Sequence, residues 1–302
     1  MIKGMWFGVI PLAITLAGTS AALAAPPDAP AAESSPAGTT IIVRPPATES
    51  GRRQKLREFT KQIVRPPRMH HPIARFFFPV CPQVRGLAPA DAEAIAERIR
   101  QNARALGVGA NDDPKCTPTI LIAFMSPAAG PPEKWLSDES PQLAHLAARE
   151  RERVLSEAGP VRAWNRVEVR DFYGQPQVIG EMTRIDPPPK SKTDPLITIE
   201  ITGATVLVAR EAAEGLTLAQ LADYVTMRTL IGTGAPPDGG PTPVQTILSL
   251  FEDADPPIEM TAFDKALVAE LYNASQNSSA RRVYNDIAAA AVRSEVKTSR
   301  EE

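Results

Sequence analysis

The side chains best suited to metal binding or nucleophilic catalysis are few in this chain, which has three histidines and two cysteines in 302 residues. His70 and His71 are adjacent, and adjacent residues of an extended segment point to opposite sides, so they do not form one ligand pair. His145 lies in a charged stretch that we predict to be helical, and we expect its side chain to be solvated. The nucleophile motif G-x-S-x-G does not occur. We therefore predict no catalytic residues, no metal ligands and no cofactor.

Carboxylates are plentiful, but paired catalytic acids are recognised by their separation in space, which a sequence does not give. Asp223 and Asp264 are the two acids to follow. We expect Asp264 to cap a helix, because Thr261 stands three residues before it, and we expect Asp223 to lie on a solvated helix face. The glycine-rich stretches GVGAND and GTGAPPDGG match neither a P-loop nor a dinucleotide fingerprint. A non-enzymatic protein is the favoured interpretation, and a hydrolase or peptidase with a non-standard site is the alternative.

Cys81 and Cys116 are predicted to form a disulfide, because the N-terminus indicates an oxidising compartment. Residues 1–24 contain Lys3, an apolar run and a final Ala-Leu-Ala, which is the pattern of a secretory signal peptide. An uncleaved anchor helix is the alternative. A redox-active pair would need a close C-x-x-C spacing, which these cysteines lack. We therefore expect a structural disulfide and a periplasmic or extracellular location.

Charge and composition limit the class of partner. Removal of the first 24 residues would leave 278 residues and, because Lys3 goes with them, a net charge of −3 instead of −2. This balance attracts neither nucleic acid nor a charged membrane surface, and aromatic residues, at 5%, do not alternate with basic ones. No second apolar stretch reaches the roughly 18 residues that a membrane span needs. The partner is unknown, and an envelope protein or a peptide is the candidate.

The segment 25–70 is predicted to be a flexible linker, rich in proline and alanine, that contains a short helix. Leu56, Phe59 and Ile63 share one side of that helix. The sequence IVRPP occurs on each side of it, at 42–46 and again in 63–67. The repeat is either a partner-docking motif or two extended pieces that precede prolines.

We expect one α/β (α+β) domain over residues 71–296, with a sheet-rich part at 71–210 and a helical part at 211–296, followed by a disordered tail at 297–302. A mixed sheet with a β-α-β start is predicted, because a strand, a helix and a continuous apolar strand follow one another. A bulge or bend is expected at Gly203. The predicted strands are 81–87, 116–125, 161–172 and 195–210, with 175–185 as a hairpin partner or loop; the predicted helices are 88–106, 140–157, 217–231, 243–251, 261–273 and 277–295.

The helix at 217–231 begins with a capping box of Thr217 and Gln220 and ends at Gly232. A strand-rich region, a packed helix and then a glycine resemble the layout of the metzincin zinc peptidases, whose motif is H-E-x-x-H-x-x-G-x-x-H. In that motif two histidines at i and i+4, with a third beyond the glycine, bind zinc, and the glutamate acts as general base. The later stretch MTAFDKALVAELYN also resembles the closing helix of matrixin-like domains.

Aligning the motif glycine with Gly232 places the first histidine at Val225, the glutamate at Thr226, the second histidine at Thr229 and the third at Ala235. The resemblance therefore implies a degenerate zincin scaffold, a pseudoenzyme with a lost metal site. If the resemblance holds, an edge strand of the sheet should run antiparallel above a cleft lined by Val225 and Thr229. Most of the mature chain also resembles a group of uncharacterised secreted proteobacterial proteins, through CPQVRGL, CTPTILIAF, LTLAQLADYVTM and TILSLFED.

Overall fold

The structure of the chain is a computed structural model that describes residues 48–64, 71–171, 173–177, 196–237 and 242–301. The predicted signal peptide, most of the predicted linker and the first IVRPP copy lie outside these residues. The helices are α1 (Glu49–Ile63), α2 (Pro89–Ala105), α3 (Ala148–Ser156), α4 (Leu218–Leu230), α5 (Ala262–Asn273) and α6 (Ala280–Glu301). The strands are β1 (Pro82–Arg85), β2 (Ile120–Met125), β3 (Val161–Asp171), β4 (Pro176–Gln177) and β5 (Ile197–Ala209).

The sheet is mixed, as predicted, and its strands in the described residues follow the order β1-β2-β5-β3-β4. β1 pairs with β2 in parallel through the crossover helix α2, which confirms the β-α-β start. β2 pairs with β5 in parallel, whereas β3 runs antiparallel to β5. The register of β3 and β5 shifts where Arg166 faces Gly203 and Val167 faces Ile201, so the predicted irregularity at Gly203 is confirmed.

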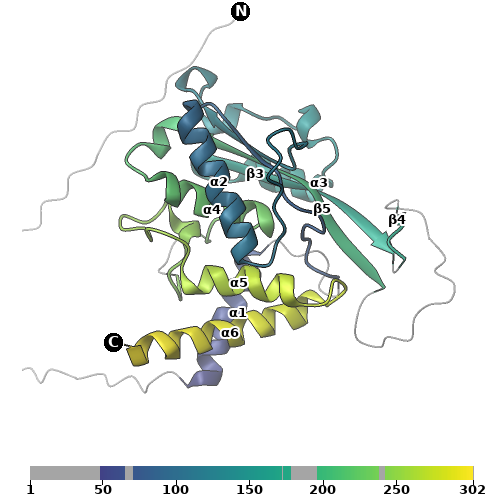
Figure 1. Cartoon of the computed structure of the whole chain (residues 1–302), viewed down its shortest axis with the longest axis vertical. Helices are drawn as coiled ribbons and strands as arrows, with labels where there is room; N and C mark the ends of the chain where they lie inside the picture. The colour runs from purple at the N-terminus through teal and green to yellow at the C-terminus, as the bar shows by residue number, and fades with distance from the viewer. Residues whose placement is uncertain (1–47, 65–70, 172, 178–195, 238–241, 302) are drawn as a thin grey trace, which may run out of the picture. The chain divides into compact units, whose positions relative to one another are not determined.

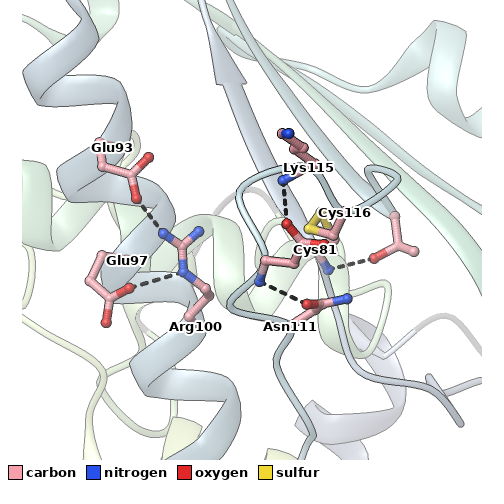
Figure 2. Close-up of a disulfide and its surroundings, with 9 residues drawn as sticks. Cys81, Glu93, Glu97, Arg100, Asn111, Lys115 and Cys116 are labelled. Carbon is pink, nitrogen blue, oxygen red and sulfur yellow. Dashed lines mark hydrogen bonds and ion pairs between the residues drawn. A yellow bond between two sulfur atoms is a disulfide. The ribbon is translucent and has the colours of Figure 1, made fainter.

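The predicted disulfide between Cys81 and Cys116 is present, with the two Cα atoms 6.2 Å apart (Figure 2). Cys81 directly precedes β1, but Cys116 lies four residues before β2, not at the start of the strand as predicted. The Thr119 N–H donates to the Cys81 carbonyl at 3.0 Å. The bridge therefore ties the loop between α2 and β2 to the edge of the sheet at which both strands begin.

Helices cover both faces of the sheet. α2 and α4 pack side by side on one face, where Ile122 and Val206 are fully buried in the main core (Figure 1). The opposite face carries a smaller cluster of Leu143, Val154 and Trp164, to which α3 contributes. These two clusters follow the alternation of side chains along the strands. α5 and α6 pack together beyond the end of α2, and α1 packs against α6 (Figure 1).

α1 belongs to the folded core, although the sequence placed it in a linker. Its Leu56, Phe59 and Ile63 are buried, and the Phe59 and Phe263 rings lie 5.7 Å apart. Val64 follows the helix and is the second residue of the second IVRPP copy, of which the structure describes only residues 63 and 64. It forms an antiparallel bridge with Thr233. The folded part therefore begins before the predicted boundary at residue 71, because the apolar side of α1 covers the α5–α6 layer.

Four further predicted elements differ in extent. The charged stretch 140–157 forms a 3-10 turn at Pro141–Leu143 and then the shorter α3. The predicted helix at 243–251 is a 3-10 turn, Ile247–Ser249. Only Pro176–Gln177 of the predicted hairpin partner pairs with β3, and residues 178–185 lie outside the described residues. α6 continues to Glu301, through most of the predicted disordered tail.

Candidate functional site

α4 is enclosed by the rest of the fold. Its residues from Gln220 to Leu230 are all buried, which is the property of a helix that is covered on every side. The predicted capping box is confirmed, since the Thr217 hydroxyl accepts from the Gln220 N–H at 3.1 Å and the Gln220 side chain accepts from the Thr217 N–H. α4 therefore holds α2, the sheet and the segments before α5 together.

The four positions of the implied zinc motif do not line a cleft. Val225, Thr226 and Thr229 are at most 1% exposed, and Ala235 is half-buried beyond the end of α4. The two threonine hydroxyls donate to carbonyls of their own helix, Thr226 to Ala222 and Thr229 to Val225, both at 2.8 Å. β3 runs antiparallel to β5, but it is an inner strand that lies between β5 and the two-residue strand β4. The expected cleft above Val225 and Thr229 is wrong, because core packing covers these side chains.

The side chain of Asn165, in β3, packs against the C-terminal end of α4. The Asn165 amide donates to the Thr229 carbonyl at 3.2 Å, and a Cβ on Gly232 would lie 2.9 Å from the same Nδ2 atom. Gly232 also has a φ of 66°, in the left-handed region that glycine adopts without a Cβ penalty. The glycine that aligns with the peptidase motif therefore has a packing reason to be there.

A buried carboxylate cluster forms around Asp223. The Arg98 guanidinium donates to both carboxylate oxygens, at 2.9 and 3.0 Å, and the Asn102 amide donates at 2.7 Å. The Met260 N–H is the fourth donor, at 2.8 Å. Asp223 is fully buried, so the predicted solvated position is wrong; α2 packs on α4 and brings Arg98 and Asn102, one helical turn apart, onto it. That i, i+4 polar pair on the apolar side of α2 is the signal that sequence reasoning missed.

A second buried polar cluster lies near the C-terminal end of α4. The Arg228 guanidinium donates to the Tyr224 hydroxyl and to the carboxylate of Glu157, and Arg228 is 1% exposed. Burial raises the pKa of Tyr224 to about 12. Arg162, also 1% exposed, donates to the Val161 carbonyl at 2.8 Å. The Arg228–Glu157 ion pair joins the residue that follows α3 to α4, while the Nε atom of Arg228 is buried without a hydrogen-bond partner. Tyr224, Arg228 and Arg162 are all buried, so the cluster lies inside the fold.

Asp264, the second of the two acids, is a cap residue as predicted. It accepts from the Thr261 N–H at 2.9 Å and from the Ile247 N–H at 2.8 Å, and it is fully buried. Burial raises its pKa, and the hydrogen bonds from Thr246, Ile247 and Thr261 act in the opposite direction. Asp264 and Asp223 belong to separate hydrogen-bond clusters, so the structure gives no indication of an acid pair.

The two histidines that the structure describes lie in different parts of the fold. His145 precedes α3 and is largely exposed, and partial desolvation together with the nearby Arg166 lowers the pKa of its imidazole. His71 lies beside α6, where its carbonyl accepts from the Ala280 N–H at 2.9 Å, and His70 lies outside the described residues. In the described part of the chain, no three His, Cys, Asp or Glu side chains form a group that could hold a metal ion.

An apolar groove lies between the C-terminal part of α2 and α5, where Figure 1 shows the two helices meeting end to side. Its volume is about 380 Å³, and small or apolar side chains dominate its lining. It adjoins the Asp223 cluster, because Asn102 and Met260 belong to both. The lining residues are Asn102, Ala105, Leu106, Met260, Lys265, Ala266 and Ala269.

The segment that precedes α5 presents an isolated aliphatic side chain next to this groove. Ile258 is 81% exposed and stands two residues before Met260, so the two Cα atoms are within about 7 Å of each other. The segment is fixed to α4 on both sides of Ile258. The Gln220 amide donates to the Pro257 carbonyl at 3.0 Å, and the Met260 N–H donates to Asp223. The groove and the exposed side chain together are the best candidate for a binding site.

A second hollow, of about 250 Å³, lies at the turn between α5 and α6 and has a mainly polar lining. Its carboxylates and its arginine are of opposite charge, and none of its described lining residues has a buried side-chain polar atom without a hydrogen-bond partner. Its polar lining residues are Glu270, Asn273, Ser275, Ser278, Arg282 and Asp286.

Comparisons of the chain with protein-family models, with curated proteins and with solved structures gave no significant match. The resemblances to metzincins and to secreted proteobacterial proteins therefore stay predictions. Within the described residues, none of the helices has both the length and the apolar character that a membrane crossing requires.

Proposed function

We propose that the chain is a non-catalytic binding protein of a secreted or periplasmic compartment, and that the groove between α2 and α5 receives an apolar side chain of a polypeptide partner. The groove beside the exposed Ile258 is the observation that carries the proposal. Binding sites are concave and mostly apolar, as this groove is.

The rigidity of this surface favours binding. Pro257 and Met260 are held by hydrogen bonds from Gln220 and to Asp223, so the segment between them does not have to be ordered when a partner arrives. Ordering a loop or a long side chain on binding costs about 0.5–1.5 kcal/mol per immobilised side chain. The buried polar cluster around Asp223 therefore has a role that needs no catalysis, which is to hold the groove and its rim in place.

An origin of the scaffold in a zinc peptidase is not supported, because core packing covers Val225 and Thr229, above which the resemblance requires a cleft. Val225, Thr226 and Thr229 are buried, which favours a role without a metal, since a zinc site needs accessible imidazoles. The Cys81–Cys116 disulfide supports an oxidising compartment, together with the predicted signal peptide.

The experiment uses the mature chain, residues 25–302, and measures its binding of an environment-sensitive apolar dye, anilinonaphthalene sulfonate. We expect saturable binding at one site, and we expect Ala269→Trp, which fills the groove, to weaken it by about tenfold or more. Ala148→Trp, on the exposed start of α3, is the matched control and should leave dye binding unchanged.

Three results would overturn the proposal. The first is a chain that takes no dye below its dimerisation range, and the second is dye binding that Ala269→Trp leaves intact, which would place the apolar site elsewhere. The third is stoichiometric zinc in the purified chain, or hydrolysis of a protein substrate that a chelator abolishes, which would make the chain a peptidase and favour the alternative function.

A further inference from the structure

We infer that the partner of this groove is a second copy of the chain, with Ile258 of each copy seated in the groove of the other. The inference rests on the proposed function, because it takes the α2–α5 groove as the binding site. It adds the identity of the occupant. Three features of one face carry it: an exposed aliphatic side chain, an apolar hollow beside it, and an acid–base pair on the rim between them.

The exposed side chain has the chemistry that the hollow accepts. Ile258 is 81% exposed, which is the highest value among the exposed large apolar residues in the described part of the chain. The groove is lined by alanines of two helices, with Leu106 and Met260 buried beneath. Short side chains on the walls leave room for a branched aliphatic group, and 380 Å³ exceeds the space that one such group fills.

Ile258 cannot enter the groove of its own chain. Pro257 and Met260 are both bonded to α4, so Ile258 is held pointing into solvent and cannot fold back into the groove that Met260 lines. Two copies related by a two-fold axis can make the contact twice, because an interface of this kind uses the same patch on both subunits. The reciprocal contact removes both isoleucines from water and fills both grooves.

In the same two-fold arrangement, the charged side chains at the rim of the groove in one copy face side chains of opposite charge in the other copy. Glu259 follows Ile258 directly, and Lys265 lines the groove; their side chains are 53% and 48% exposed and lie 3.3 Å apart. A two-fold operation that places Ile258 near the partner groove also brings Glu259 near the partner's copy of that lysine. The acid and the base therefore set the register of the two copies, as charge pairs at the edge of an interface do.

The test measures the molecular mass of the mature chain in solution as a function of concentration, by sedimentation equilibrium. We expect reversible dimerisation. Ile258→Asp removes the aliphatic side chain and Ala269→Trp fills the groove, and each should raise the dissociation constant by about tenfold or more, since the two contacts act together. Tyr173→Ser alters another exposed apolar side chain, 56% exposed beyond the end of β3, and should leave dimerisation unchanged.

Mixing the two variants separates a lost contact from a misfolded chain. The Ile258→Asp chain keeps an open groove, and the Ala269→Trp chain keeps Ile258. In the mixed dimer, this isoleucine can enter the open groove, so one of the two contacts forms. We expect the mixture to dimerise more tightly than either variant alone. Charge reversal gives a second test: Glu259→Lys and Lys265→Glu should each weaken the dimer, and their mixture should restore it, because every facing pair is then of opposite sign.

The failures of the two proposals are distinguishable. A chain that stays monomeric at all concentrations, yet binds the dye in a way that Ala269→Trp abolishes, overturns the second copy as occupant and leaves the groove as a site for another polypeptide. A dimer that neither Ile258→Asp nor Ala269→Trp weakens overturns the inference, because its interface lies elsewhere. A chain whose groove takes no dye below its dimerisation range overturns the proposed function and the inference with it.

Discussion

At the end of α4, Gly232 is required by the side chain of Asn165, which lies 67 positions earlier in the sequence. Gly232 has a φ of 66° and faces the amide of Asn165, which is bonded to the Thr229 carbonyl. Any other residue at this position would have to adopt the left-handed backbone conformation, and its Cβ would also displace the Asn165 amide. The glycine is thus explained by local packing, whether or not an ancestral metal site lay nearby.

Substitution of this glycine should be costly. Gly232→Ala is expected to lower the free energy of unfolding by about 2–3 kcal/mol, from the left-handed φ and the lost Asn165 hydrogen bond. Gly215→Ala is the matched control, with a φ of 84° and no atom within 4 Å of the added Cβ, and should cost about 1 kcal/mol. Urea unfolding of both variants measures the difference. Equal losses would show that Asn165 gives way without cost.

Asp223 shows where residue-scale reasoning failed. The sequence suggested a solvated acid, since a lone aspartate on a helix is usually exposed. Its donors come from α2 and from the segment before α5, which are 125, 121 and 37 positions away. By contrast, Asp264 was predicted correctly, because its capping partner Thr261 is only three residues away.

At the scale of elements, α1 is the main revision. The helix and its apolar side were predicted from spacing alone, and the structure confirms them. Its place in the fold depends on α6, to which Arg52 is joined by an ion pair with Glu295. The low-complexity composition on either side of α1 favoured a linker, whereas the burial of Leu56 shows that the helix covers the core.

A core substitution in α1 tests this placement. Leu56 is fully buried, so Leu56→Ala should lower the free energy of unfolding by about 2–5 kcal/mol. The neighbouring Lys55 is exposed, and Lys55→Ala should change stability by less than about 0.5 kcal/mol. Thermal and urea unfolding of the mature chain provide the measurement. If both substitutions were equally mild, α1 would not belong to the cooperative unit.

At the scale of the whole molecule, burial of tyrosines links stability to alkaline pH. Burial raises the pKa values of Tyr224, Tyr272 and Tyr284, that of Tyr224 to about 12. Two of them lie at junctions of elements: the Tyr224 hydroxyl accepts from Arg228, which pairs with Glu157 directly after α3, and the Tyr272 hydroxyl donates to the Leu230 carbonyl at 2.8 Å. A raised pKa of an acid means that the folded state holds its proton more tightly than the unfolded state does.

Stability should therefore fall as the pH rises from about 10 to about 12. The tyrosine contribution is fully present below the unfolded pKa of about 10 and is lost as the pH passes through the folded value, a loss of about 2–3 kcal/mol for Tyr224 alone. Thermal unfolding as a function of pH, with tyrosinate absorbance recorded in parallel, measures it. Tyr224→Phe should make the fall shallower; an unchanged slope would show that Tyr224 ionises alike in both states.

The sequence by itself determined the local features: the capping boxes, the glycines after helices, the β-α-β start and the pairing of Cys81 with Cys116. These follow from spacing over a few residues, or from having only two cysteines in a chain predicted to be exported. Only the tertiary structure decided the burial of Asp223, the filling of the end of α4 by Asn165 and the groove beside Ile258, because each depends on segments far apart in the sequence. Periodicity indicates which side of a helix is buried, but not which helix packs against it, and a groove exists only where two helices meet incompletely.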